Sequence, residues 1–199
     1  MNTARDLVIV AMDVAPDRPL ERGDLSLALA GAELLDLADA GALAVDGEHI
    51  VPATASRTGD RLLDQAADQL VREQPYEAVE EWLWRRGREL ASAYADALEK
   101  DGVTARSRRT PFRAPQTELV DSPERERARE RWVSDEPVLV ALAAAAGIRE
   151  ESEEDAEKLT DDVAATVLAA VGDAVMELEA VRQRRAIEDA AFDNVWRGF

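Results

Sequence analysis

Arginine is the residue type through which this chain could act on a ligand. Only Lys100 and Lys158 among its 24 basic residues are lysines, and three clusters of arginine stand out. The clusters are Arg85, Arg86 and Arg88 beside Trp82 and Trp84; Arg106, Arg108, Arg109 and Arg113; and Arg125, Arg127, Arg129 and Arg131. A guanidinium group forms bidentate contacts with phosphate. If the first two clusters gather on one side of the fold, they could bind a phosphorylated headgroup.

The same arginines have a second interpretation, in which they only offset the surrounding acids. The third cluster alternates with glutamates, a pattern that predicts a salt-bridged helix face. Trp82 and Trp84 are two positions apart and cannot share a helix face, so we expect one in the core and the other nearer the surface. For the first two clusters, ligand binding and charge balance both stay open.

Catalytic and metal-binding chemistry has few candidate residues. His49 is the only histidine and there is no cysteine, which excludes a Ser-His-Asp triad, a multi-histidine metal site and thiolate chemistry. We expect His49 to be structural or exposed. The acidic run Glu150 to Glu157 lacks the glycine and the alternating spacing of a calcium loop, so it predicts a solvated turn. No glycine-rich phosphate loop is present. We therefore expect a non-enzymatic protein with no metal and no cofactor.

Charge and hydropathy restrict the partners. The chain has 199 residues and a formal net charge of −18, which argues against general nucleic-acid binding because an acidic surface repels phosphates. The N-terminus lacks the cationic start of a signal peptide. The longest apolar run, Val138 to Ala146, is far shorter than the roughly 18 residues of a membrane span. We expect a cytoplasmic protein with no transmembrane segment, soluble or peripheral at the inner membrane face.

The stretch from Gly23 to Gly41 predicts the element around which the rest is organised. Leucine and alanine cover most of a helix of about five turns. Its polar residues, Ser26, Glu33 and Asp36, fall on one narrow stripe. A helix that is apolar over most of its circumference is normally buried. Gly41 stands where a left-handed C-terminal cap is expected.

A β-hairpin is predicted directly after this helix. Asp46-Gly47 lies between two short apolar runs within Ala42 to Pro52, which is a strong signal for a tight turn. A helix followed by a hairpin is also the plan of a winged-helix DNA-binding protein. A DNA-binding wing needs basic residues, yet the tip carries Asp46 and Glu48, and residues 1–59 hold four basic and ten acidic residues. DNA binding is therefore the weaker alternative.

The rest of the chain predicts further helices and one irregular segment. Helices are expected from a cap at Thr3 to before Pro16, over Asp60 to Glu73, over Tyr76 to Asp101 with a break at Gly87, from Ser122 to Trp132, from Ser134 to Ala146, and from Thr160 to about Trp196 with a bend near Gly172. Val103 to Val120 has two prolines and no helical period, so we expect an extended or hairpin excursion. The prediction is a mainly α fold: a single helical domain, residues 1–199, around a central buried helix, with small β-hairpin excursions.

The order of these segments resembles the Golgi phosphoprotein 3 family, in particular its short bacterial members. Four stretches carry the resemblance: Leu25 to Leu37 followed by Gly41-Ala42-Leu43; Thr58 to Ala66; the helix end Leu98 to Val103; and the arginine-rich helix with Trp132-Val133, followed by Leu139 to Ala146. The first two are the more specific. The resemblance implies a mainly α fold with a central buried helix.

The resemblance also implies a ligand. Eukaryotic members of that family bind phosphatidylinositol 4-phosphate on Golgi membranes and tether enzyme tails. A tryptophan, an arginine on the central helix and two arginines one helical turn apart hold the headgroup there. This sequence has Glu21 and Ala30 at the first two of these positions. It has Arg88 and Ala91 at the arginine pair, and an alternative register takes Arg85 and Arg88.

The family's membrane-facing, self-associating hairpin would fall in Val103 to Val120, where Phe112 is the main bulky apolar residue. Taken together, these features lead us to expect a non-enzymatic peripheral protein that binds an anionic phospholipid headgroup, such as a phosphoinositide, through Arg88 and then Arg85. The alternative is a protein-interaction module without lipid binding, whose partner is another protein.

Overall fold

The computed structural model describes residues 2–14, 19–54, 57–107, 116–150, 159 and 161–197, and the side chains of Ser107, Gln116 and residues 190–197 are outside that description. Its helices are α1 (Thr3–Asp13), α2 (Arg22–Asp39), α3 (Arg61–Asp68), α4 (Val79–Arg86), α5 (Leu90–Lys100), α6 (Pro123–Val133), α7 (Pro137–Ala145) and α9 (Asp162–Arg197). The strands β1 (Leu43–Asp46) and β2 (His49–Pro52) form one antiparallel hairpin, and β3 (Thr104–Ser107) and β4 (Gln116–Leu119) form another. The expected mainly α fold with small hairpin excursions is confirmed.

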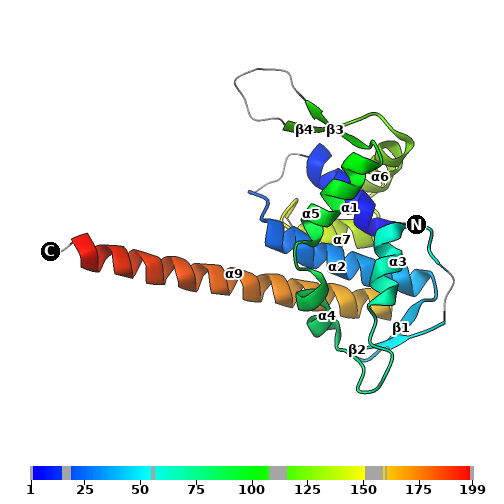
Figure 1. Ribbon diagram of the computed structural model, residues 1–199, viewed down its shortest axis with the longest axis horizontal. Coiled ribbons are helices and arrows are strands. Elements are labelled where there is room, and N and C mark those ends of the chain that lie inside the picture. The colour runs from blue at the N-terminus through cyan, green and yellow to red at the C-terminus, as the bar shows by residue number, and fades with distance from the viewer. Residues whose placement is uncertain are drawn as a thin grey trace.

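Helix α2 lies at the centre of the molecule, as predicted. Its side chains are buried from Asp24 to Leu37, and α1, α3, α4, α5, α7 and α9 all pack against it (Figure 1). The three polar residues of its stripe, Ser26, Glu33 and Asp36, are buried as well. A buried polar group costs free energy unless it is hydrogen-bonded, so each of these side chains needs a partner from a neighbouring element.

The end of α2 follows the predicted glycine stop. Gly41 has φ of +70°, and its N–H donates to the carbonyl of Ala38 while the next N–H, of Ala42, donates to Leu37. This is the bonding pattern of a left-handed helix cap, which glycine adopts without steric cost. The β1–β2 hairpin comes directly after it, with Asp46 paired to His49 across a two-residue turn.

The first helix begins differently from the prediction. The residue that caps α1 is Asn2, whose Oδ1 accepts from the N–H of Arg5 over 2.9 Å, so the predicted Thr3 cap is wrong. Thr3 is instead the first helical residue, and its N–H is bound by Asp36 of α2. The cap is therefore one residue earlier than predicted, and Asp36 adds a bond from a different helix that a short sequence pattern cannot show.

The middle of the chain folds as two helices around Gly87, as predicted. Trp82 of α4 is fully buried and donates from Nε1 to the carbonyl of Ala30 over 3.1 Å, while Trp84 is only partly buried. The expected division between a core and a surface tryptophan is confirmed. Helix α3 ends at Asp68 and not at Glu73, because residues 71–75 are exposed and offer no apolar face to bury.

The last third of the chain confirms its predicted helix starts with one shift. Ser122 caps α6 by accepting from the N–H of Arg125, and Glu136, within the predicted start of the next helix, caps α7. Helix α9 runs without interruption through Gly172, so the expected bend does not divide it, and its C-terminal part projects from the body (Figure 1). The predicted acidic turn lies outside the described residues after Glu150. Over the described ranges, no helix is both long enough and apolar enough to cross a membrane.

Candidate functional site

The break between α4 and α5, which carries Arg88, lies against the N-terminal half of the central helix. Gly87 ends α4, and Glu89 has a left-handed backbone with φ of 56° before α5 begins. The N–H of Ala91 donates to Oγ of Ser26 on α2 over 3.1 Å. A Cβ atom on Gly87 would stand 3.3 Å from the carbonyl oxygen of Ser26, so glycine allows this close approach. Arg88 is exposed at this break, and no hydrogen bond or ion pair among the described residues involves it.

Arg85 lies in the last turn of α4 and is held by a carboxylate. Its Nε donates to Oε1 of Glu77 over 2.6 Å, and its Nη2 donates to Oε2 over 2.7 Å. The guanidinium also stands 5.1 Å from the centroid of the Trp82 ring. The hydrogen bonds that Arg85 donates to Glu77 raise the pKa of Arg85, and partial burial opposes that shift. Arg85 belongs to α4, whereas Arg88 lies in the break before α5. The two arginines therefore do not share one continuous helix, although their spacing in the sequence is one turn.

Arg86 belongs to the core and not to a ligand site. Its Nε and Nη2 donate to the two oxygens of Glu33 over 2.7 and 2.8 Å, and the hydroxyl of Tyr94 donates to Glu33 over 3.1 Å. Glu33 is fully buried, and burial raises its pKa while the bonds from Arg86 oppose that shift. Of the two interpretations left open for this cluster, charge balance therefore describes Arg86, because its guanidinium is bound to a buried carboxylate on α2.

The second arginine cluster is described at one position. Arg106 on β3 forms an ion pair with Glu99 over 2.8 Å, while Arg108, Arg109 and Arg113 lie outside the described residues, as does Phe112. Among the described side chains of this hairpin, Arg106 is thus the member of the second cluster, and its charge is already balanced by Glu99.

The third arginine cluster holds helices together, but mainly by contacts between elements. Arg127 and Arg131 of α6 both donate to Asp6 of α1, a residue with no exposed surface, over 3.1 and 2.7 Å. Arg131 also pairs with Glu136 at the start of α7 over 2.7 Å. The predicted salt-bridged helix face is confirmed, and the acids that pair with it lie outside α6. Asp6 carried no local signal, because its partners lie more than a hundred residues away in the sequence.

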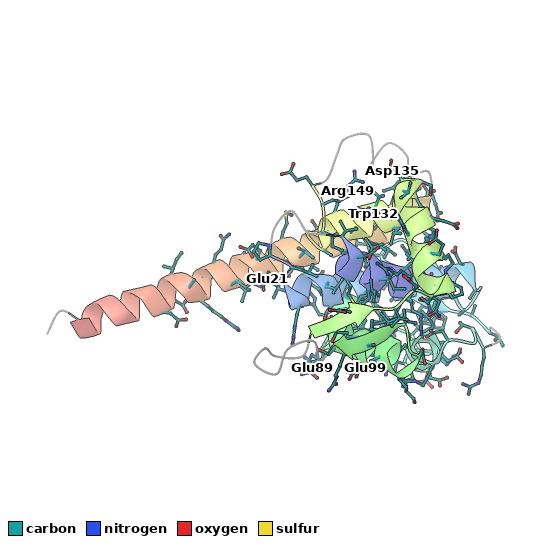
Figure 2. The ribbon with its side chains drawn as sticks, turned by 90° about the horizontal axis from the view of Figure 1, so that it is seen from above. Glu21, Glu89, Glu99, Trp132, Asp135 and Arg149 are labelled. Atoms are coloured by element: carbon teal, nitrogen blue, oxygen red, sulfur yellow. The ribbon has the colours of Figure 1, made fainter. Side chains whose placement is uncertain are left out.

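A further arginine–tryptophan pair, which the sequence did not indicate, joins the ends of α6 and α7. The guanidinium of Arg149 lies 5.8 Å from the ring centroid of Trp132 and 3.4 Å from Oδ1 of Asp135. Figure 2 shows these three residues together at one edge of the molecule. Because Asp135 and the ring both contact Arg149, this arrangement fits a structural clamp.

The positions that the resemblance assigns to a headgroup are only partly suited to one. Glu21, the N-cap residue of α2, is exposed and carries the wrong charge for a phosphate. Ala30 is fully buried, and Ala91 is nearly so. Arg182 of α9 pairs with Asp24 near the same end of α2 over 2.6 Å. Arg88 is thus the residue at these positions whose charge and exposure suit an anion.

Other parts of the surface are acidic. A polar cavity of about 670 Å³ between α1, α2 and α3 is lined by five carboxylates and two arginines, Arg5 and Arg127. Arg5 pairs there with Asp60, Asp101 and Glu124. The tip of the β1–β2 hairpin exposes Asp46, Glu48 and His49, so the exposed position expected for His49 is confirmed. Acidic linings of this kind repel phosphate, so neither region suits a phosphorylated headgroup.

A domain of helices packed around one buried central helix, with two small hairpins, is the class that this fold defines. The family model of Golgi phosphoprotein 3 (GPP34) matches residues 4–189, and the chain belongs to that family. The family consists of non-enzymatic adaptors, and its eukaryotic members bind phosphatidylinositol 4-phosphate headgroups. A comparison with curated proteins finds no match.

Proposed function

We propose that the protein is a non-enzymatic adaptor that binds anionic phospholipid headgroups at a membrane surface, with phosphatidylinositol 4-phosphate as the reference ligand. Membership of the Golgi phosphoprotein 3 family supports the adaptor class. The observation that carries the proposal is the placement of Arg88, which is exposed at the α4–α5 break beside the N-terminal half of α2. Because the guanidinium of Arg88 is exposed and forms no ion pair with the described residues, it can bind a phosphate without first breaking such a pair.

Arg85 is the second residue of the proposed site. The bonds that it makes within the described chain use Nε and Nη2, so its Nη1 hydrogens can still be donated to a phosphate. Glu77 stands against the other edge of the same guanidinium, and its negative charge repels an approaching phosphate. We therefore expect Arg85 to contribute less to headgroup binding than Arg88.

The binding that we propose is weak and sensitive to salt. The net charge of −18 opposes approach to an anionic surface, and only Arg88 and Arg85 offer phosphate contacts at this site. The attraction of one basic side chain to an anionic bilayer contributes about 1 kcal/mol of binding free energy at the surface. At 0.1 M salt, screening confines this attraction to within about 10 Å of the bilayer. The protein is therefore expected to associate with membranes peripherally and reversibly.

Flotation of the full chain with lipid vesicles tests this proposal. We expect binding at low salt to phosphatidylcholine vesicles that contain phosphatidylinositol 4-phosphate, and less binding to vesicles of phosphatidylcholine alone. Arg88→Ala should weaken binding about fivefold, which corresponds to the loss of about 1 kcal/mol. Arg129→Ala is the matched control, because Arg129 is an exposed arginine of α6 and its removal changes the net charge equally. Absence of binding at low salt would remove the proposal.

A second candidate is a protein-interaction module that does not bind lipid. It is favoured by the ion pairs of Arg85 with Glu77 and of Arg86 with Glu33, since both carboxylates compete with a phosphate. This candidate predicts capture of a protein partner in a pull-down that is unaffected by Arg85→Ala and Arg88→Ala. Loss of capture in either variant would instead connect partner binding to the headgroup site.

A further inference from the structure

Helix α9 has one face that belongs to the core. Ala164, Val167, Val171, Ala174 and Val175 are buried. They lie on the part of α9 that packs against α2, α4 and α7. Packing against the core therefore explains why these side chains, in the first half of the 36-residue helix, are buried.

The second half of α9 leaves the body of the protein. Arg182 pairs with Asp24 over 2.6 Å, and every described side chain from Gln183 to Asp189 is exposed. Ile187 has 70% of its surface exposed. Figures 1 and 2 show this part of α9, which we call the arm (residues 183–197), extending away from the other helices. An isolated helix of about 15 residues is marginal in water, so the arm is expected to need a partner.

A groove runs beside the exposed face of α9. Its volume is about 820 Å³, and small apolar residues line most of it, including Ala141, Ala144 and Ala145 at α7 and Ala169 and Gly172 on α9. Asp24, Asp173 and Glu179 contribute acids to the lining, and no basic residue is among the described lining residues. Such a groove fits a helix that is apolar on one face and basic at one edge.

The groove and the arm form one continuous surface. Along α9, the residues Ala165, Ala169, Gly172, Met176, Ala180, Gln183 and Ile187 recur every three or four positions, so they share one helix face. All of them except Ile187 line the groove, and Ile187 continues the same face onto the arm, where it is exposed. Met176 and Ile187 are its large apolar members, with 67% and 70% of their surfaces exposed.

We propose that a second copy of this chain covers this surface, with the two α9 helices antiparallel and each arm lying in the groove of the other copy. Placing Met176 opposite Ala180 of the second copy also brings Ile187 opposite Ala169, so each large side chain meets a small one. The same register places Arg184 within one residue of Asp173 of the second copy. Two identical ion pairs then form, because a two-fold interface repeats every contact.

Charge is the observation that favours a second copy over an unrelated partner. The arm begins with Arg184 and Arg185 after Gln183, whereas the acid Asp173 lines the groove. A parallel pairing would set Arg184 against Arg184, whereas the antiparallel pairing sets it against an acid. The antiparallel orientation is therefore the one in which Arg184 meets an opposite charge.

Disulfide cross-linking tests the arrangement, because the chain has no cysteine of its own. We expect Ala169→Cys chains mixed with Ile187→Cys chains to form a mixed disulfide on oxidation. Each variant alone should not cross-link, since like positions are then 18 residues apart along the helices, or about 27 Å. Cross-linking of Ile187→Cys chains with each other, or none in the mixture, would overturn the proposal.

Sedimentation equilibrium of the full chain supplies the second measurement. We expect a dimer whose dissociation constant rises about tenfold or more in Asp173→Arg and falls back when Arg184→Asp is added. Both residues are exposed, so these variants keep the core intact. Ile187→Glu should also weaken the dimer. A monomer at all concentrations would overturn the proposal, as would a dimer that these changes leave intact. If Ile187→Glu lowers vesicle binding of a monomeric chain, the arm meets lipid and not a second copy.

Discussion

The carboxylate of Asp36, on the central helix, accepts a hydrogen bond from the backbone N–H of Thr3, the first residue of α1, over 2.9 Å. Its other oxygen accepts from the N–H of Ala4 over 3.1 Å, so Asp36 binds two of the N–H groups that a helix start leaves without partners. Burial raises the pKa of Asp36 from 3.8 to about 6, and the bonds from Thr3 and Ala4 oppose that shift. The start of α1 is therefore tied to the central helix through a group that titrates in mildly acidic solution.

This carboxyl predicts a pH dependence of stability. A pKa of about 6 in the folded chain against 3.8 when unfolded means that the folded state binds the proton more tightly. The stabilisation linked to this proton is complete below the unfolded pKa and is lost as pH rises through about 6, by up to about 3 kcal/mol. Urea denaturation of the wild type and of Asp36→Asn, measured below pH 3.8 and above about pH 6, isolates the contribution of Asp36 to stability. The wild type should lose stability relative to the variant as pH rises, and a constant difference would contradict the assignment.

The buried ion pair between Arg86 and Glu33 predicts a large loss of stability when one partner is removed. Arg86→Ala leaves a fully buried carboxylate without its charge partner, which costs about 3 to 5 kcal/mol. Arg85→Ala is the matched control, since that arginine is 41% exposed in its own ion pair and such pairs contribute at most about 1 kcal/mol. Equal shifts of the denaturation midpoint in the two variants would show that Arg86 is not part of the core.

Local patterns predicted most of the fold, and tertiary partners account for what they missed. The apolar circumference of α2, the glycine at its end and the Ser122-Pro123 start of α6 each depend on neighbours in the sequence, and the structure confirms all three. The bonds from the start of α1 to Asp36 and the partners of the third arginine cluster depend on contacts across the fold. Local propensity holds no information about such contacts.

The candidate site divides in the same way. The residue types of the first arginine cluster and its break at Gly87 could be read from the sequence, but the carboxylates that bind Arg85 and Arg86 could not. One signal was present, because Glu33 stands on a helix that is otherwise apolar, and a buried acid implies a cationic partner. Which of the neighbouring arginines would supply it depends on the packing of α4 against α2.

The two neighbouring tryptophans are expected to differ in their effect on stability. Trp82→Phe removes the bond from Nε1 to the carbonyl of Ala30 and makes a fully buried side chain smaller, at a cost of about 1 to 3 kcal/mol. Trp84→Phe changes a partly exposed residue and should cost less than about 1 kcal/mol. Thermal unfolding of both variants makes the comparison, and a larger effect at Trp84 would contradict the placement of Trp82 in the core.

The left-handed residue that ends α2 predicts a cost for any side chain there. Gly41 has φ of +70°, and no atom lies within 4 Å of a Cβ built on it, so the effect of Gly41→Ala is conformational and not steric crowding. We expect a loss of about 1 to 2 kcal/mol in unfolding free energy. Chemical denaturation measures this loss, and an unchanged midpoint would show that α2 can end without a left-handed residue at position 41.

The binding of a soluble headgroup to the full chain tests the proposed function most directly. In NMR spectra of ¹⁵N-labelled protein titrated at low salt with inositol 1,4-bisphosphate, the headgroup of phosphatidylinositol 4-phosphate, we expect shifts at residues 85–91 and at the start of α2. These shifts should disappear in Arg88→Ala and persist in Arg129→Ala. Shifts confined to other elements, or shifts at the α4–α5 break that survive Arg88→Ala, would contradict the headgroup site proposed at Arg88.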